Sequence, residues 1–198
     1  MGRSMIRKVP QLVRGSPIDE DPDEPVIRRL GSGDLDALGA LYDRHAPALL
    51  RFARRSAPFD DAQDIVQTTF LRVSRIAARY DPARGSGRAW LYGVAAQVLR
   101  ERRRSMARLT RMLARLGDAV SIPRAEDTPG QGDDAVAVDQ ALDRLSEAKR
   151  VTFLLVEVEG FSCEEVSNVL GVPIGTVWTR LHHARRELRA VLGEEQAK

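Results

Sequence analysis

Hydrophobic residues recur at helical spacing along most of this chain, and no segment requires a β-strand. Asp34 can cap the first long helix, while Pro47 inside that helix predicts a kink or a break. Two further helices are expected, over residues 60–79 and 88–114. The apolar stripe expected for the first helix consists of Leu35, Leu38, Leu41, Tyr42, Leu49 and Leu50.

Charge is distributed unevenly over the second and third helices. Acidic residues crowd the first turns of the second helix and arginines its last turns, which is the polarity that the helix dipole favours. The loop Tyr80–Gly87 that follows is indicated by its Pro and Gly residues. Beyond Leu99 the third helix becomes a basic run with Glu101 as its single acidic residue; its arginines are Arg100, Arg102, Arg103, Arg104, Arg108, Arg111 and Arg115.

The composition changes abruptly after this basic run. Residues 117–139 are rich in Gly, Pro and acidic side chains, with Arg124 as the one basic residue, and are typical of a linker. We therefore expect an all-α chain with two small helical domains joined by a flexible acidic linker. The expected boundaries are a disordered arm over 1–26, a first domain over 27–115, a linker over 116–139, a second domain over 140–192 and a tail over 193–198.

The second domain carries the pattern of a helix-turn-helix. One long helix is expected over Ala141–Glu159. Ser162 and Glu165 then fit a capping box at the start of a short helix. The turn is Gly171–Pro173, and the next helix begins near Ile174, since proline is well tolerated near a helix start. In a helix-turn-helix the second of these helices enters the major groove of DNA.

The last helix presents unusual residues to solvent. Its buried stripe is expected to be Val177, Leu181, Ala184 and Leu188. That register leaves outside Trp178, Thr179, His182, Arg185, Arg186 and, at the edge of the stripe, His183. Such groups suit base edges, thymine methyls and phosphates, although Trp178 could instead pack against the first domain or a partner. The adjacent histidines diverge by about 100° around the helix, so no metal site is expected from them.

Composition narrows the function classes. The 198 residues carry a net charge of +3 with a pI of about 9.4, and the clustering of arginines favours a polyanionic partner. Cys163 is the only cysteine, which excludes an internal disulfide or a cysteine-based metal site within one chain. The sequence has no membrane-length apolar run and no signal peptide, so a cytoplasmic location is expected. No catalytic residue, metal, cofactor or small-molecule substrate is expected, because a phosphate-binding loop is lacking and capping explains the one carboxylate cluster, Asp60, Asp61 and Asp64.

Two separated segments together resemble a known family. DAQDIVQTTFLRVSRIAARYDPARGSGRAWLYGVAAQVLRERRR resembles region 2 of the extracytoplasmic-function group of bacterial RNA polymerase sigma factors. LDRLSEAKRVTFLLVEVEGFSCEEVSNVLGVPIGTVWTRLHHARREL resembles their region 4. The resemblance covers about residues 27–192 and implies a subunit that directs core polymerase to specific promoters and aids melting of the −10 element. The implied partners are core RNA polymerase, promoter DNA that is duplex at −35 and single-stranded at −10, and an anti-sigma factor that could hold the protein at a membrane.

The resemblance also implies site residues. The residues implied to bind core polymerase are Asp61, Gln63, Asp64, Gln67, Thr68 and Arg72. Binding of the −10 element falls on Arg84, Arg88, Trp90, Gln97, Arg100, Arg103 and Arg104, although Trp90 is expected in the core rather than as a stacking platform. Binding of the −35 element falls on Thr176, Trp178, Thr179, Arg180, His182, His183 and Arg186.

The chain departs from the family pattern at several of these positions. Relatives often have Arg where Gly93 stands, an Arg-Asn pair where Ala96 and Gln97 stand, and a basic residue at the places of Trp178 and His183. Promoter preference therefore cannot be copied from a relative. A histidine at a phosphate or guanine contact would make promoter affinity sensitive to pH near neutrality; an affinity that stays flat from about pH 6 to 8 excludes this hypothesis.

A second function class stays open from the residues alone. A stand-alone helix-turn-helix regulator would bind duplex DNA without polymerase and would use its first domain for sensing or dimerisation. The arginine-rich third helix and the polar face of the second helix favour the polymerase subunit over this alternative.

Overall fold

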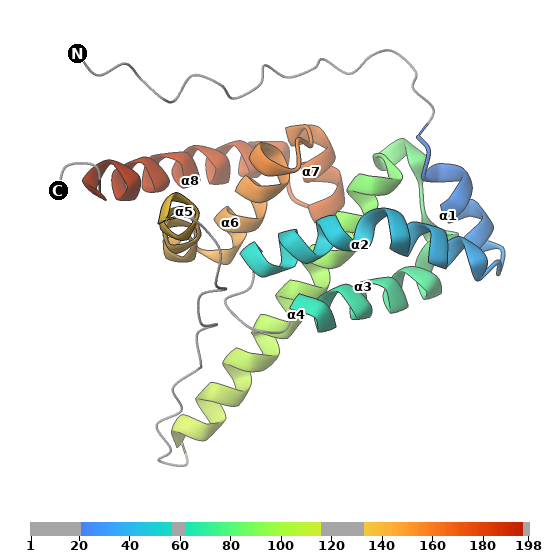
Figure 1. Cartoon of the computed structure of the whole chain (residues 1–198), viewed down its shortest axis with the longest axis horizontal. Coiled ribbons are helices and arrows are strands. Elements are labelled where there is room, and N and C mark those ends of the chain that lie inside the picture. Colours follow the sequence, from blue (N-terminus) through green and yellow to red (C-terminus); the bar gives the residue numbers. More distant parts are fainter. Residues whose placement is uncertain (1–20, 57–61, 116–132, 196–198) are drawn as a thin grey trace.

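The computed structural model describes residues 21–56, 62–115 and 133–195, and every regular element within these ranges is helical (Figure 1). The helices are α1 (Glu24–Gly31), α2 (Asp36–Ser56), α3 (Ala62–Ile76), α4 (Gly87–Arg115), α5 (Asp133–Arg144), α6 (Glu147–Phe153), α7 (Cys163–Leu170) and α8 (Ile174–Glu195). Two 3-10 turns, η1 (Ala77–Arg79) and η2 (Pro82–Arg84), and a π-helical turn, η3 (Leu154–Val158), complete the described chain. The expected all-α fold of two helical domains is confirmed.

The first domain is built from α1 to α4 around one hydrophobic core. Leu41 and Leu49 of α2 are buried in this core together with Val73 of α3 and Leu91 of α4. The sequence predicted either a kink or a break at Pro47. The helix α2 continues through this residue, so the break does not occur. Proline removes one backbone hydrogen bond from a helix, and the buried positions on both sides of Pro47 offset that loss.

Two residues of the stripe expected for α2 are exposed. Leu35 is 71% exposed because the helix begins only at Asp36, whose amide donates to Asp34 Oδ1 at 3.0 Å. Tyr42 is 44% exposed and lies at the edge of the buried face, with its ring centroid 4.9 Å from that of Phe70. The stripe predicted from apolar spacing therefore includes two residues that α2 does not bury.

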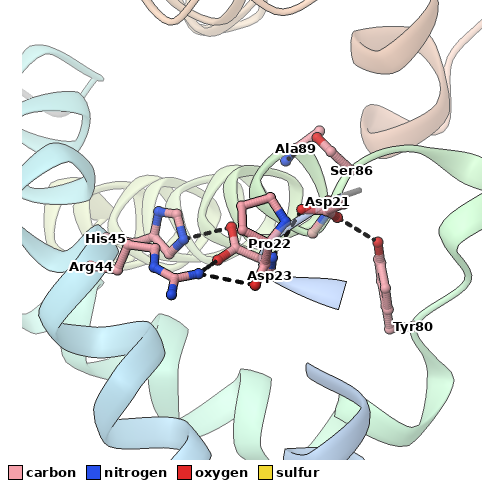
Figure 2. Close-up of polar contacts among 9 residues, drawn as sticks. Asp21, Pro22, Asp23, Arg44, His45, Tyr80, Ser86 and Ala89 are labelled. Carbon is pink, nitrogen blue, oxygen red and sulfur yellow. Dashed lines mark hydrogen bonds and ion pairs between the residues drawn. The ribbon is translucent and has the colours of Figure 1, made fainter. Parts of the chain in front are cut away.

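The chain enters the first domain through an acidic segment that the sequence assigned to the disordered arm (Figure 2). Asp23 is only 3% exposed, with Oδ2 lying 2.7 Å from His45 Nε2 and Oδ1 paired with Arg44. Burial alone would raise the pKa of Asp23, but the hydrogen bonds from His45 and Arg44 outweigh burial and hold that pKa below its ordinary value. The Tyr80 hydroxyl donates to Asp21 Oδ2 at 3.1 Å. The expected boundary at residue 26 is therefore wrong, because these ion pairs and α1 hold residues 21–26 in the fold; the remaining arm lies outside the described residues.

The second domain begins earlier than expected and contains one more break. The helix α5 starts at Asp133, inside the segment expected to be linker. The single helix expected over Ala141–Glu159 divides at Leu145 and Ser146, where Ser146 has extended backbone angles (φ −61°, ψ 150°). Leu145 is 4% exposed, so the break lets both α5 and α6 point apolar residues at one core.

The helix-turn-helix forms as the sequence predicts. The Glu165 amide donates to Ser162 Oγ at 3.1 Å, and the Ser162 amide donates to Glu165 Oε2 at 2.9 Å, which completes the capping box. Gly171 ends α7 in the left-handed region (φ 64°), a conformation that glycine adopts without strain. The buried stripe of α8 is confirmed, since the residues 0–7% exposed on this helix are Val177, Leu181, Ala184 and Leu188.

The two domains contact each other chiefly through α7 and the first turns of α4 (Figure 1). The C-terminal half of α4 runs away from this contact and projects beyond the other helices (Figure 1). Contacts also join Arg88 to Glu159 and Tyr92 to Phe161 across the boundary between the domains. The tertiary structure thus brings the expected −10-binding helix against the first helix of the helix-turn-helix.

Candidate nucleic-acid and polymerase interfaces

The buried stripe of α8 fixes the rotation of this helix about its own axis. That orientation places the expected −35 residues outward. Trp178, which is 57% exposed, Thr179, His182 and Arg186 are exposed, while Thr176, Arg180 and His183 are half-buried. Because Trp178 stays open to solvent, packing into the first domain is not its role in this conformation. Arg185 Nε donates a hydrogen bond of 2.9 Å to Glu157 of η3, which joins α8 to the segment that precedes the helix-turn-helix.

The rings of the paired histidines of α8 are steeply inclined to each other. The ring centroids of His182 and His183 lie 5.7 Å apart at an interplanar angle of 72°. Within the described ranges, no group of three His, Cys, Asp or Glu side chains could hold a metal ion. The two imidazoles are instead placed to offer hydrogen bonds at the surface of the recognition helix.

The loop before α4 and the first turns of α4 form one wall of a hollow. The hollow has a volume of about 210 Å³, and Arg84, Trp90 and Gln97 line it from the first domain. Trp90 is half-buried, with its ring centroid 5.4 Å from that of Tyr80, so it belongs partly to the core and partly to the hollow. Tyr80 in turn holds the loop, because its hydroxyl lies 3.2 Å from Gly85 O. Three residues expected at the −10 element are therefore neighbours in space.

Arg88 points away from this hollow toward the second domain. Its Nη1 donates to the Glu159 carbonyl oxygen at 3.0 Å and its Nη2 to Glu159 Oε2 at 2.7 Å. The guanidinium also lies 4.5 Å from the ring centroid of Phe161. Tyr92 donates to the same Glu159 carboxylate at 2.7 Å; burial, and then the hydrogen bond to Glu159, raise the pKa of Tyr92, which keeps the hydroxyl protonated as a donor.

The basic run continues along α4 beyond the hollow. Arg104 is exposed and Arg100 is half-buried. Arg103 Nη1 lies 3.4 Å from Glu147 Oε2 of α6. Guanidinium groups along one helix make a track for phosphates, whose binding should weaken strongly with added salt. The structure therefore places Arg100 and Arg104 on α4 outside the contact with Glu147.

The exposed face of α3 carries the expected polymerase-binding residues. Gln63, Asp64, Gln67 and Thr68 are all exposed, while Asp61 lies outside the described residues. Arg72 is half-buried and makes hydrogen bonds of 2.9 and 2.5 Å to the two carboxylate oxygens of Glu101. This pair joins α3 to α4 beside the exposed polar face.

Family models and curated relatives identify the chain. Residues 41–109 match the model described as Sigma-70 region 2, and residues 135–188 match the model described as Sigma-70, region 4. The ECF RNA polymerase sigma factor SigE of Mycolicibacterium smegmatis is 32% identical over 194 residues, which cover 91% of this chain and 74% of that relative. The chain belongs to the extracytoplasmic-function sigma factors of RNA polymerase.

Further relatives and solved structures agree with this family. The RNA polymerase sigma factor NccH of Alcaligenes xylosoxydans is 31% identical, covering 90% of this sigma factor and 98% of the relative. The structure of CnrH in complex with the cytosolic domain of CnrY has a TM-score of 0.62 at 28% identity and covers 87% and 97% of the two chains. RpoE in complex with the anti-sigma factor NepR from Bartonella quintana has a TM-score of 0.61 at 26% identity, covering 74% and 91%.

The expected function is confirmed at this level. The sigma factor directs core polymerase to promoters, and the stand-alone regulator is not favoured. Its relatives are transcription initiation factors. In the part of the chain that the structure describes, no helix is both long and apolar enough to cross a membrane.

Sequence reasoning missed four residues of this sigma factor that the structure makes prominent. Leu71 is 58% exposed on the same face of α3 as Gln67 and Thr68. Its signal was available, since Leu71 falls outside the period of the buried residues of α3. Tyr92, Glu159 and Phe161 meet only across the domain boundary, and no local pattern in the sequence reveals such a contact.

Proposed function

We propose that promoter recognition by this sigma factor is divided between its two domains. The main support for this proposal is the outward face of α8, which presents Trp178, Thr179 and His182 to solvent. The buried stripe fixes the rotation of the helix about its axis. Aromatic, hydroxyl and imidazole groups on a helix-turn-helix recognition helix suit the edges of bases in a major groove. The helix α8 then reads the duplex −35 element with the residues Thr176, Trp178, Thr179, Arg180, His182, His183 and Arg186.

The first domain then takes the −10 element as a single strand. The hollow between Arg84, Trp90 and Gln97 offers an aromatic face, an amide and a guanidinium to an unstacked base. Arg100, Arg103 and Arg104 follow the hollow along α4 and suit the phosphates of the same strand. Arg88 belongs to the same proposal, but Glu159 holds its guanidinium in this conformation. Strand opening needs no catalytic residue or cofactor, because preferential binding of the open strand shifts the equilibrium toward it.

The exposed face of α3 binds core polymerase in this proposal. Gln63, Asp64, Gln67 and Thr68 supply the polar rim, and Leu71 supplies an apolar anchor among them. Protein interfaces combine an apolar centre with a polar rim, and Leu71 is the exposed apolar side chain on this face. Arg72 flanks this face and acts through its pair with Glu101. Asp61 is part of the same proposal but lies outside the described residues.

An anti-sigma factor is the remaining partner of the proposal. Both solved relatives are described in complex with a partner: CnrH with the cytosolic domain of CnrY, and RpoE with the anti-sigma factor NepR. A comparable partner would cover part of the surface that polymerase and promoter use. The sigma factor would then act in the cytoplasm and be held at a membrane only through such a partner.

Run-off transcription tests the proposed function. The purified protein is added to sigma-free core polymerase with fragmented genomic DNA of the source organism, and transcript starts are mapped. New starts that share two upstream elements support the proposal and provide the promoter sequence. Absence of starts together with no co-migration of protein and core polymerase on a sizing column would contradict it.

Replacement of the exposed indole tests the −35 assignment. We expect Trp178→Ala to weaken binding of a duplex carrying the mapped −35 element about 30-fold, or ~2 kcal/mol, because the anchor of the interface is lost. The measurement is a fluorescence-anisotropy titration of the labelled duplex. The side chain is 57% exposed, so the unfolding temperature should change little.

Leu35→Ala is the matched control for this variant. Leu35 is 71% exposed and lies in the first domain, so its truncation also removes exposed apolar surface but should leave duplex affinity unchanged. Equal affinity of Trp178→Ala and the unchanged protein would remove Trp178 from the −35 interface.

A further inference from the structure

The loop before α4 is tied at both of its ends to one carboxylate. Asp21 Oδ2 accepts a hydrogen bond of 3.1 Å from the hydroxyl of Tyr80, where the loop begins (Figure 2). The same oxygen accepts a hydrogen bond from the amide of Gly87, the first residue of α4. Asp21 therefore joins the two ends of the loop, although it lies 59 and 66 residues away from them in the chain.

The start of α4 has a cap of its own besides Asp21. Ser86 precedes the helix, and its Oγ accepts a hydrogen bond of 3.2 Å from the Ala89 amide, as an N-cap residue does. The Gly87 amide is another of the donors that have no partner within the helix, and water could satisfy it at an exposed helix end. Here the acceptor comes from a distant segment, and its negative charge is favourable at a helix start. The contact of Asp21 thus fastens one segment to another in addition to ending a helix.

The acidic segment, residues 21–23, lies directly on the first turn of α4. A Cβ atom added at Gly87 would lie 2.6 Å from Ile27 Cδ1 and 2.8 Å from Asp23 Cβ. Carbon atoms do not approach each other so closely, so only a glycine allows this contact. The acidic segment is itself anchored, because Asp23 is paired with His45 of α2. The carboxylate of Asp21 is therefore carried by a part of the chain that is fixed to both α2 and α4.

The tied loop carries one side of the hollow proposed for the −10 base. Arg84 lies between the two tied ends and lines the hollow together with Trp90 and Gln97. The ring of Tyr80 contacts that of Trp90, with 5.4 Å between the centroids. Burial, and then the neighbouring charge of Asp21, raise the pKa of Tyr80, which keeps its hydroxyl protonated as a donor. The position of Arg84 relative to Trp90 thus depends on how the loop is closed.

We propose that Asp21 is a positioning residue of the −10 site, which closes the loop Tyr80–Gly87 and thereby sets Arg84 beside the base held at Trp90. This inference rests on the proposed −10 role of the hollow. Asp21 lies outside residues 41–109, the stretch that matches Sigma-70 region 2, so the site extends into the segment before that stretch. Loss of the carboxylate should loosen the loop without removing a group that contacts DNA.

Hydrogen exchange tests the structural part of this proposal. Exchange of the full chain is followed by mass spectrometry, and the peptide that covers residues 81–87 is compared with peptides of α2 and α8. We expect Asp21→Ala to exchange about tenfold faster in the loop and as the unchanged chain does in α2 and α8, because only the loop loses an acceptor. The control is Asp43→Ala, which removes an exposed carboxylate from α2. Equal loop exchange in all three chains would overturn the proposal.

Strand binding by the holoenzyme tests the functional part. The probe is the labelled non-template −10 strand of a promoter mapped by run-off transcription, in which each base in turn is replaced by an abasic site; binding is measured by fluorescence anisotropy. The unchanged protein should lose most affinity where the missing base is the one that occupies the hollow. Asp21→Ala should bind the intact strand about tenfold more weakly, yet bind that abasic strand as the unchanged protein does, because the base contact is already absent there. Tyr80→Phe loses only the hydroxyl and should show the same pattern with a smaller loss.

The outcomes separate the positioning role from the proposed −10 site. Equal weakening of intact and abasic strands by Asp21→Ala, or full affinity of this variant for the intact strand, would overturn the positioning role alone. If no abasic site weakens binding of the unchanged protein, the −10 role of the hollow fails, and the positioning role fails with it. Asp43→Ala should match the unchanged protein on every strand; a tenfold loss in this control would attribute the effect to net charge and overturn the assignment to Asp21.

Discussion

Leu71→Asp should weaken binding of this sigma factor to core polymerase about 100-fold, which corresponds to ~3 kcal/mol. Leu71 is 58% exposed on the face of α3 that carries Gln67 and Thr68, one turn further along the helix, and docking would bury it. A carboxylate placed there would have to lose its water on docking without gaining a partner, which is strongly unfavourable. The affinity is measured by titration of labelled protein with sigma-free core polymerase, and run-off transcription should fall in parallel.

The control for this result is Leu35→Asp. Leu35 is even more exposed, at 71%, but precedes α2 and lies outside the α3 face, so its replacement should leave polymerase affinity unchanged. Neither variant should unfold the domain, because both side chains are largely in solvent. Full polymerase affinity of Leu71→Asp would show that docking uses another face.

Asp23→Asn should lower the free energy of unfolding of the first domain by about 3 kcal/mol at neutral pH. Asp23 is 3% exposed and joins the entry of the chain to α2 through His45 and Arg44 (Figure 2). An amide in this place keeps the shape but removes the charge, which leaves the Arg44 guanidinium without its carboxylate partner. The measurement is urea denaturation followed by circular dichroism.

The pH dependence of this effect has a definite sign. The pKa of Asp23 in the folded chain lies below its ordinary value of 3.8, since the hydrogen bonds from His45 and Arg44 outweigh burial. The contribution of Asp23 to stability is therefore complete above pH 3.8 and is lost as the pH falls through the lower folded-state pKa. The stability of Asp23→Asn should accordingly decrease less on acidification than that of the unchanged chain.

Asp43→Asn is the matched control for Asp23→Asn. Asp43 is exposed on α2 beside Arg44, so this variant removes one negative charge from the same region without touching the buried pair. Its stability should stay within about 0.5 kcal/mol of the unchanged chain. Equal losses in the two variants would mean that net charge, and not the buried contact, stabilises this entry segment.

The helix-turn-helix could be read from the sequence because its signals are local. A capping box spans Ser162 to Glu165, and a left-handed helix end requires a residue such as Gly171. The roll of α8 follows from four apolar residues at helical spacing, and their burial confirms it. Each signal involves residues within one or two helical turns, so no knowledge of distant segments was needed.

Errors arose where an element depends on contacts far along the chain. Residues 21–23 have the acidic, proline-containing composition of a disordered arm, yet Asp23 is buried by pairing with His45 and Arg44. The apolar spacing over Ala141–Glu159 gave no sign of the break at Ser146, because both halves remain apolar on one side. In both places, tertiary packing outweighed a weak local preference.

The sequence by itself determined the helical class, the order of the two domains and the face that α8 presents to solvent, because helical periodicity and capping are short-range effects. The tertiary structure alone decided the surroundings of the arginines on α4 and on the turn before it. Arg88 lies on Glu159 and Arg103 near Glu147, whereas Arg84 lines the hollow with Trp90. Partners 44 and 71 residues apart in the chain meet only when two complete domains pack together, and no local spacing encodes that meeting.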